Sequence, residues 1–177
     1  MNRFLIAFVV VFVLAQTSLL GQSWSLGAAG IYGDDIESFG AHFRGYYNFK
    51  NDRVCFGPEF SHFFKKTETH NGEEVTTKLS EVNFNLHYVF ELTEHFGVYP
   101  LTGVNLSFET EEFEVNGEPH SESITEFGSN LGFGIHRTFG RLMFFGEYDH
   151  LFSKLSQNSF LIGVFYIIGK KPTSEHE

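Results

Sequence analysis

Cysteine, methionine, tryptophan and proline are scarce in this chain of 177 residues, with 1, 2, 1 and 4 copies, respectively. Because Cys55 is alone, no internal disulfide can form, and we expect its thiol to be a small buried side chain. Basic residues are also few: 12 lysines and arginines stand against 22 acidic residues, a formal net charge of −10. This acidity argues against nucleic acid as a partner, since nucleic acid would need a basic surface.

Apart from its first 21 residues, the chain has no apolar run near the ~18 residues that a membrane-spanning helix needs. The first 21 residues have the order of a secretory signal peptide: Arg3 supplies an early positive charge, an apolar stretch continues to Ala15, and small residues follow. No cysteine comes next to carry a lipid anchor. We expect a signal peptide at 1–21, one domain at 22–169 and a polar tail at 170–177.

Phenylalanine is abundant, with 23 copies, and it recurs in segments where apolar and polar side chains alternate. In one segment Val82 and Phe84 alternate with Asn83 and Asn85, a period of two that is typical of a half-buried strand. Eight such strands are predicted, at Trp24–Tyr32, Phe39–Phe49, Val54–Phe64, Leu79–Phe90, Phe96–Phe108, Thr125–Phe139, Leu142–Phe152 and Asn158–Ile168.

A strongly apolar face on every strand of an exported chain favours contact with lipid. Hydrocarbon offers no partner to an open strand edge, so the sheet must close. The sequence therefore predicts an all-β fold: an eight-stranded, antiparallel, up-and-down transmembrane β-barrel in the outer membrane of a double-membraned bacterium, apolar outside and polar inside. A soluble lipocalin-like barrel is the alternative, and it would require the opposite polarity.

Turn residues give an independent check on which face of each strand is apolar. A shift of the strand pairing by one residue would move every side chain of a strand to the opposite face. A two-residue turn at Asn51-Asp52 pairs Phe49 with Val54 and sets Arg44 opposite Glu59. Two more turns pass the same test: Gly140-Arg141 pairs Phe139 with Leu142, and Asn116-Gly117 pairs Phe108 with Thr125.

The remaining hairpin, at Asn71-Gly72, needs a three-residue loop with Gly72 in the left-handed conformation if Phe60 is to face Val82. Its flanks, and those of Asn116-Gly117, keep strand character over Thr67–Thr77 and Glu109–Glu118. A lipid-facing band needs only about nine to eleven residues per strand, so these hairpins should protrude on the outer side, with the short turns in the periplasm.

Inward-facing polar residues predict a network that fills the barrel and satisfies its own hydrogen bonds, because buried charge must be paired. Its candidate members are Arg44, Glu59, Asn83, Asn85, His87 and Glu147. Eight strands enclose just enough space for side chains, which disfavours an open pore. Inward glycines such as Gly134 and Gly163 leave two alternatives open: they make room for aromatic rings, or they leave a cavity for a small ligand.

The outer acids from Glu109 to Glu126 could gather Ca²⁺ or Mg²⁺, but their spacing follows no ion-binding loop. The nine histidines are scattered, with His70 and His120 near loop acids. We predict no metal site and no cofactor.

In pattern, Trp24 to Gly169 resembles the small eight-stranded barrels of the outer-membrane protein X and A families. Gly163, Tyr166 and Ile168 match the terminal-strand signal that the outer-membrane assembly machinery recognises in such proteins. Two features depart from that pattern: Leu161 stands where the signal prefers a polar residue, and a tail follows the last strand. The resemblance implies a monomer in contact with outer-membrane lipid and lipopolysaccharide, and in the protein X family a protruding sheet is associated with surface contact.

The leading hypothesis is a non-enzymatic barrel with an envelope-structural or surface-contact role, exerted through its acidic outer hairpins on an extracellular partner. The first alternative is a narrow channel, or a binder of a small or apolar ligand inside the barrel. A resemblance to lipid A deacylase barrels suggests a third, a hydrolase using His150, Ser153 and either Glu147 or Asp149. The His-to-Ser spacing departs from that family.

Overall fold

The computed structural model describes residues 23–49, 53–70, 73–115 and 118–169, and every regular element in these ranges is a β-strand. The strands are β1 (Ser23–Gly33), β2 (Ser38–Asn48), β3 (Val54–Phe63), β4 (Lys66–His70), β5 (Glu73–Tyr88), β6 (Phe90–Glu91), β7 (Phe96–Val115), β8 (Glu118–Phe139), β9 (Leu142–Phe152) and β10 (Gln157–Ile168). The predicted signal peptide and polar tail lie outside these ranges. No helix among the described residues is long and apolar enough to cross a membrane.

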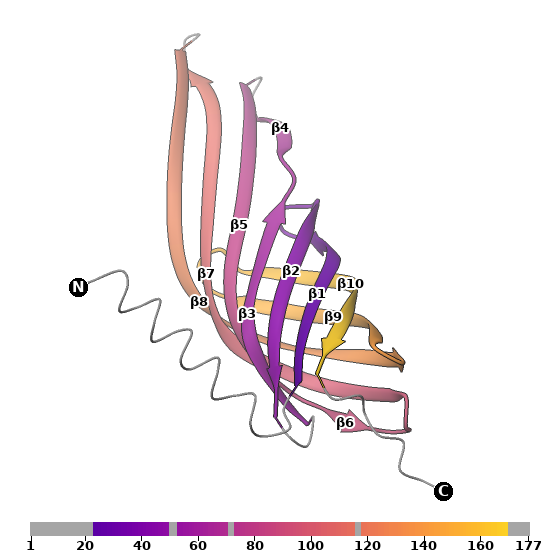
Figure 1. Ribbon diagram of the computed structural model, residues 1–177. Helices are drawn as coiled ribbons and strands as arrows, with labels where there is room; N and C mark the ends of the chain where they lie inside the picture. The colour runs from indigo at the N-terminus through magenta and orange to yellow at the C-terminus, as the bar shows by residue number, and fades with distance from the viewer. Residues whose placement is uncertain (1–22, 50–52, 71–72, 116–117, 170–177) are drawn as a thin grey trace, which may run out of the picture.

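Antiparallel pairing of neighbouring strands closes the sheet into a barrel (Figure 1). The first and last strands meet: β1 pairs with β10 from Trp24 opposite Ile168 to Gly33 opposite Ser159. Eight strands form the wall, namely β1, β2, β3, β5, β7, β8, β9 and β10, while β4 and β6 extend two of them. The predicted eight-stranded antiparallel fold is confirmed.

Strand β6 follows β5 after a short break and pairs with β7 in the same register as β5 does. His87 lies opposite Leu101 before the break, and Phe90 lies opposite Val98 after it. Pro100 lies between these two pairs and has no N–H to donate to the ladder. The short interruption thus follows from one residue.

Strand β4 corrects one detail of the sequence prediction. Phe60 does face Val82, as expected. Beyond Phe63, however, the partners shift by one residue, and His70 pairs with Glu73, so the connection is two residues long rather than three. The extra residue lies between β3 and β4, as a bulge would place it. Gly72, for which a left-handed conformation was predicted, is outside the described residues.

Side chains alternate cleanly between the two faces of the wall. Phe133 is 62% exposed and Ile162 80% exposed on the outside, whereas Arg44 and Glu59 are each 4% exposed on the inside. The outer face forms an apolar belt; its members include Phe39, Phe43, Phe60, Phe84, Val104, Phe127, Leu131, Ile135, Phe144 and Phe160. This is the polarity of a transmembrane barrel.

The two ends of the barrel differ. We call the end that holds Ser23 and Ile168 the terminal rim; the short turns after β2, β6 and β8 lie there, and it faces the periplasm. At the terminal rim Trp24 packs edge-on against Tyr47, with ring centroids 5.2 Å apart, as expected of an aromatic belt at the membrane interface. The opposite end, the hairpin rim, faces outward.

Beyond the hairpin rim, β4, β5, β7 and β8 extend the wall as a part that we call the protruding sheet (Figure 1). Strands β5 and β7 remain paired as far as Val75 opposite Phe113, and β7 and β8 as far as Val115 opposite Glu118. The ladder between β8 and β9 ends at Ser129 opposite Phe152. Among the described strands, the outer half of β8 is therefore paired on one side only.

Candidate functional site

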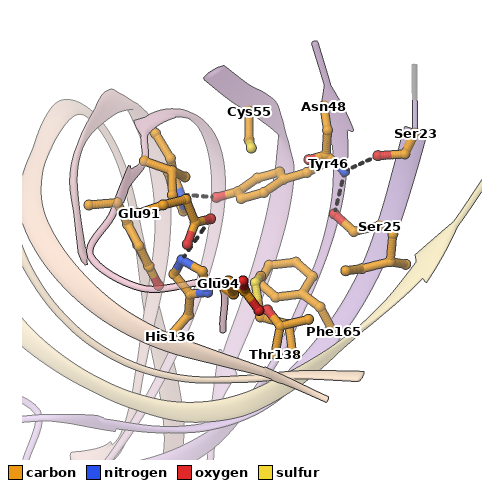
Figure 2. Close-up of a pocket in the computed structure, with 15 residues that line it drawn as sticks. Ser23, Ser25, Tyr46, Asn48, Cys55, Glu91, Glu94, His136, Thr138 and Phe165 are labelled. Carbon is orange, nitrogen blue, oxygen red and sulfur yellow. Dashed lines mark hydrogen bonds and ion pairs between the residues drawn. The ribbon is translucent and has the colours of Figure 1, made fainter. Parts of the chain in front are cut away.

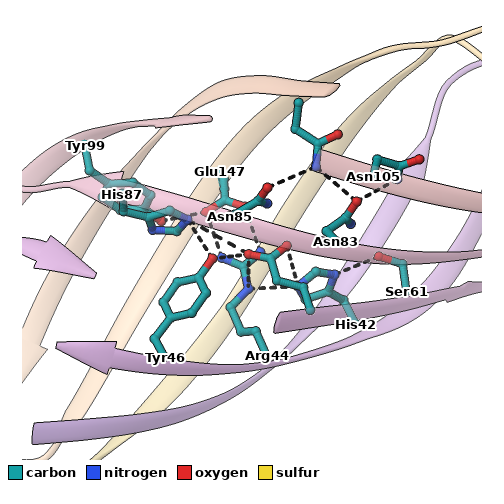
Figure 3. Close-up of polar contacts among 12 residues, drawn as sticks. His42, Arg44, Tyr46, Ser61, Asn83, Asn85, His87, Tyr99, Asn105 and Glu147 are labelled. Carbon is teal, nitrogen blue, oxygen red and sulfur yellow. Dashed lines mark hydrogen bonds and ion pairs between the residues drawn. The ribbon is translucent and has the colours of Figure 1, made fainter. Parts of the chain in front are cut away.

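A two-point ion pair holds the centre of the barrel interior. The guanidinium of Arg44, on β2, donates from Nη1 to Glu147 Oε2 at 2.8 Å and from Nη2 to Glu147 Oε1 at 2.7 Å. Glu147 lies on β9, on another side of the barrel (Figure 3). Glu59 is the strand neighbour of Arg44, as the turn register predicted, but it is farther away, at 3.7 Å from Arg44 Nε. The direct bonds of Arg44 to a carboxylate thus cross the barrel.

Tyrosine hydroxyls form further hydrogen bonds to the carboxylates of Glu59 and Glu147. Tyr46 Oη donates to Glu59 and lies 2.7 Å from His87 Nε2. Tyr99 Oη donates to Glu147 Oε2 at 3.0 Å. These side chains come from β2, β5 and β7, so the ion pair ties several strands together.

A second cluster, of amides, lies nearer the hairpin rim. Asn83 Oδ1 accepts a hydrogen bond from Asn105 Nδ2 at 2.6 Å (Figure 3) and another from Asn130 Nδ2 at 3.0 Å. Asn130 Nδ2 also lies 3.1 Å from Asn85 Oδ1. Three strands are joined by these bonds, and every amide in the cluster is buried.

The structure brings all six sequence-predicted interior residues together within the barrel. It adds partners that were not in the predicted set: His42, Tyr46, Tyr99, Asn105 and Asn130. Their inward parity was readable from the alternation, and Asn105 lies directly opposite Asn83 on a neighbouring strand. The contacts of Tyr99 with Glu147 and of Asn130 with Asn83 join strands that are not neighbours, and neighbouring-strand register carries no information on such contacts.

The interior is divided into separate spaces. A cavity of about 300 Å³ lies at the hairpin rim and one of about 160 Å³ at the terminal rim. Between them, the space lined by Glu59, Glu81 and Asp149 amounts to about 10 Å³, room for a single water at most. The described side chains thus constrict the interior between the two cavities.

Inward glycines lie where aromatic rings need space. A Cβ atom on Gly134 would clash with the ring of Tyr99, and one on Gly163 would clash with the ring of Phe145 and the backbone of Ala28. At these two positions the glycines make room for aromatic rings, which is the first of the two alternatives that the sequence left open.

Three of the four side chains considered for hydrolysis have other partners; Asp149 Oδ1 is buried without a hydrogen bond. His150 Nδ1 lies 2.8 Å from Asn158 Oδ1, and Ser153 Oγ accepts the N–H of Leu155 at 3.0 Å. Glu147 is bound to Arg44. Among the described residues, no group of three or more histidine, cysteine, aspartate or glutamate side chains is placed to hold a metal ion.

The protruding sheet is the second candidate site, and it concentrates negative charge. Glu111 on β7 lies directly opposite Glu122 on β8, so both side chains share one face of the sheet. Lysines neutralise two other acids: Lys78, on β5, contacts Glu112, and Lys154 Nζ lies 2.8 Å from Glu126 Oε1.

Two carboxyl groups of the protruding sheet, those of Glu109 and Glu112, have pKa values shifted from the ordinary value. A hydrogen bond from Lys78 lowers the pKa of Glu112 below its ordinary value. Partial burial, with repulsion from Glu111, raises the pKa of Glu109.

Comparisons with known proteins agree with this architecture. A family model described as outer membrane protein beta-barrel domain matches residues 5–167. No curated protein sequence matches the chain.

Among solved structures, the attachment invasion locus protein Ail of Yersinia pestis, in complex with the heparin analogue sucrose octasulfate, is similar, with 19% identity, a TM-score of 0.58 and coverage of 83% of this chain and 97% of that one. A major outer membrane protein from Thermus thermophilus gives 13% identity, a TM-score of 0.64 and coverage of 83% and 99%. The N-terminal β-barrel domain of Pseudomonas aeruginosa OprF gives 14% identity, a TM-score of 0.55 and coverage of 82% of this chain and 97% of that one. At these identities the likeness concerns the fold, and the family match carries the identity. This chain is an outer-membrane β-barrel protein and belongs to the outer-membrane protein β-barrel domain family.

Proposed function

We propose that this protein acts by contact at the cell surface, through the acidic face of its protruding sheet, and that its extracellular partner is positively charged. The pair formed by Glu111 and Glu122 carries this proposal. Like charges directly opposite each other destabilise a pair of strands. Their joint presence on an exposed sheet is accounted for if a cationic group lies between them in the complex.

Neighbouring features support the same assignment. Glu109 and Glu118 share the sheet face of Glu111 and Glu122, and the free edge of β8 adds unpaired backbone groups beside them. Such an edge can accept an extended segment of another protein as an additional strand. The polyanion in the Ail structure is a ligand of that protein; the acidic sheet of this chain favours a ligand of opposite sign.

The rest of the barrel supports a role without catalysis or conduction. The central ion pair and the amide cluster occupy the middle of the interior, and His150 and Ser153 are hydrogen-bonded to Asn158 and Leu155. We assign the interior network, including Arg44, Glu59, Asn83, Asn85, His87 and Glu147, to holding the wall rigid beneath the protruding sheet.

Binding to a lysine-rich peptide tests the proposal, with the protein in nanodiscs of zwitterionic lipid and the peptide immobilised. We expect salt-sensitive binding that falls at least ~tenfold in E111Q/E122Q. The matched control is E91Q/E94Q, which removes two carboxylates at the other rim and should bind as the unmodified protein does. Equal binding by all three proteins would overturn the assignment.

Export and assembly complete the proposal. Removal of residues 1–21 would leave the barrel at 22–169 and the tail at 170–177, and the mass of the mature protein would report the cleavage site. Gly163, Tyr166 and Ile168 lie on β10, the strand that closes the barrel on β1. We propose that they present this strand to the assembly machinery and that the product is a monomer surrounded by lipid and lipopolysaccharide.

A further inference from the structure

The cavity at the terminal rim has no part in the surface contact proposed above. It measures about 160 Å³, comparable with an engineered cavity of about 150 Å³ that holds benzene. The rings of Tyr46 and Phe165 line it (Figure 2), and the ring of Tyr99 also lines it. Its size and this wall suit a ligand whose apolar body is about one ring.

His136 gives the cavity a polar group in need of a partner. The residue is 4% exposed, lines the cavity, and neither of its ring nitrogens makes a hydrogen bond. Its Nε2 lies 3.6 Å from Glu91 Oε1, close enough for attraction but too far for a hydrogen bond. A buried polar atom left in this state costs free energy, which a ligand with an N–H group would recover.

The charge of the residues that line the cavity favours a ligand with a positive charge. Glu91 and Glu94 both line the cavity, and among its described lining residues there is no lysine or arginine. Arg44 lies behind the wall, 5.8 Å from the ring centre of Tyr46 and 5.7 Å from that of Phe165, but its charge is matched by Glu147. Aromatic faces also attract cations.

We propose that this cavity is a periplasmic binding site for a small organic cation: an ammonium group on a body of about one ring. The ammonium lies between Glu91, Glu94 and His136, and the ring packs against Tyr46 and Phe165. This inference does not depend on the proposed surface contact, because the residues involved belong to opposite rims.

Calorimetric titration of the protein in dodecyl maltoside, a detergent without an ammonium group, tests the proposal with benzylammonium as the ligand. Benzyl alcohol and benzoate are the neutral and anionic controls of similar shape. We expect benzylammonium to bind at least ~tenfold more tightly than benzyl alcohol, and benzoate not to bind. Equal affinity for the charged and neutral compounds would overturn the proposal.

Two variants locate the site. E91Q/E94Q changes only exposed side chains and should weaken benzylammonium binding at least ~tenfold, whereas E111Q/E122Q, on the protruding sheet, should leave it unchanged. In NMR spectra, the ring signals of His136 should shift on titration. Binding that ignores E91Q/E94Q, or that leaves the His136 signals in place, would contradict the assignment.

Discussion

Arg44 and Glu147 are 103 positions apart in the chain, yet they form a two-point ion pair whose side chains are 0% and 1% exposed. The pair joins β2 to β9 through the barrel interior. Two parallel N–H···O bonds fix the geometry as well as the charge. This pair is the anchor of the interior network.

Replacing Arg44 with methionine should lower the free energy of unfolding by roughly 3–5 kcal/mol, because Glu147 and Glu59 would then be buried beside no cation. Urea unfolding from lipid bilayers, followed by the fluorescence of Trp24, the only tryptophan, gives this value. The double variant R44M/E147Q should lose less than the sum of the two single variants. Additive losses would show that the pair does not act as a unit.

Gly134→Ala should destabilise the barrel by about 1–3 kcal/mol, since the added Cβ would displace the Tyr99 ring and its hydrogen bond to Glu147. Gly30→Ala is the matched control, because a Cβ there meets nothing within 4 Å. The same unfolding assay compares them. Equal stabilities of the two variants would argue against aromatic packing at Gly134.

Phe133→Arg and Phe139→Arg test which face meets lipid. Both side chains point outward, but Phe139 lies beside the turn at the terminal rim and Phe133 six residues farther into the wall. An outward arginine deep in the hydrocarbon costs about 2–4 kcal/mol, and one near the interface about 0–1 kcal/mol. In lipid vesicles, Phe133→Arg should therefore lower the free energy of unfolding more than Phe139→Arg does. The reverse order would place the hydrocarbon elsewhere on the wall.

Asp34 and Asp35 should titrate in opposite directions from their common ordinary value of 3.8. Burial alone would raise the pKa of Asp34, but hydrogen bonds from the side chain and backbone of Asn158 outweigh it and lower the pKa. Burial, together with repulsion from Asp34, raises the pKa of Asp35. Near pH 3.8, Asp34 should be mostly ionised and Asp35 mostly protonated.

Carboxyl carbon NMR over a pH series measures both midpoints, and Asn158→Ala should raise that of Asp34. Since the pKa of Asp34 falls on folding, its contribution to stability is present above pH 3.8 and is lost as the pH drops through the lower, folded value. Identical midpoints for the two aspartates would contradict the hydrogen-bonded arrangement at Asp34.

Much of the fold was accessible from the sequence because strand faces and turns constrain one another. Alternation located all eight wall strands, and the Asn51-Asp52 turn placed Arg44 opposite Glu59 as found. The hairpin at Asn71-Gly72 was predicted with the wrong loop length, because a bulge between β3 and β4 restores the same register as an extra loop residue. From the register of the barrel alone, these two solutions are indistinguishable.

Contacts across the barrel were beyond reach of the same reasoning. Local register identifies neighbours on adjacent strands, whereas Arg44 meets Glu147 through the three-dimensional closure of the wall. The cavity around His136 is similar: its lining comes from both ends of the chain and from the turn after β6. The alternation predicted that these side chains face the interior, but it could not predict which of them are in contact.

Ion conductance across a planar lipid bilayer tests most directly whether the barrel interior is closed at its centre, which leaves the protein to act through its outer surface. We expect no sustained single-channel current from the purified barrel, because the space between the two cavities, lined by Glu59 and Asp149, amounts to only about 10 Å³. Steady unitary currents from the unmodified protein would contradict it.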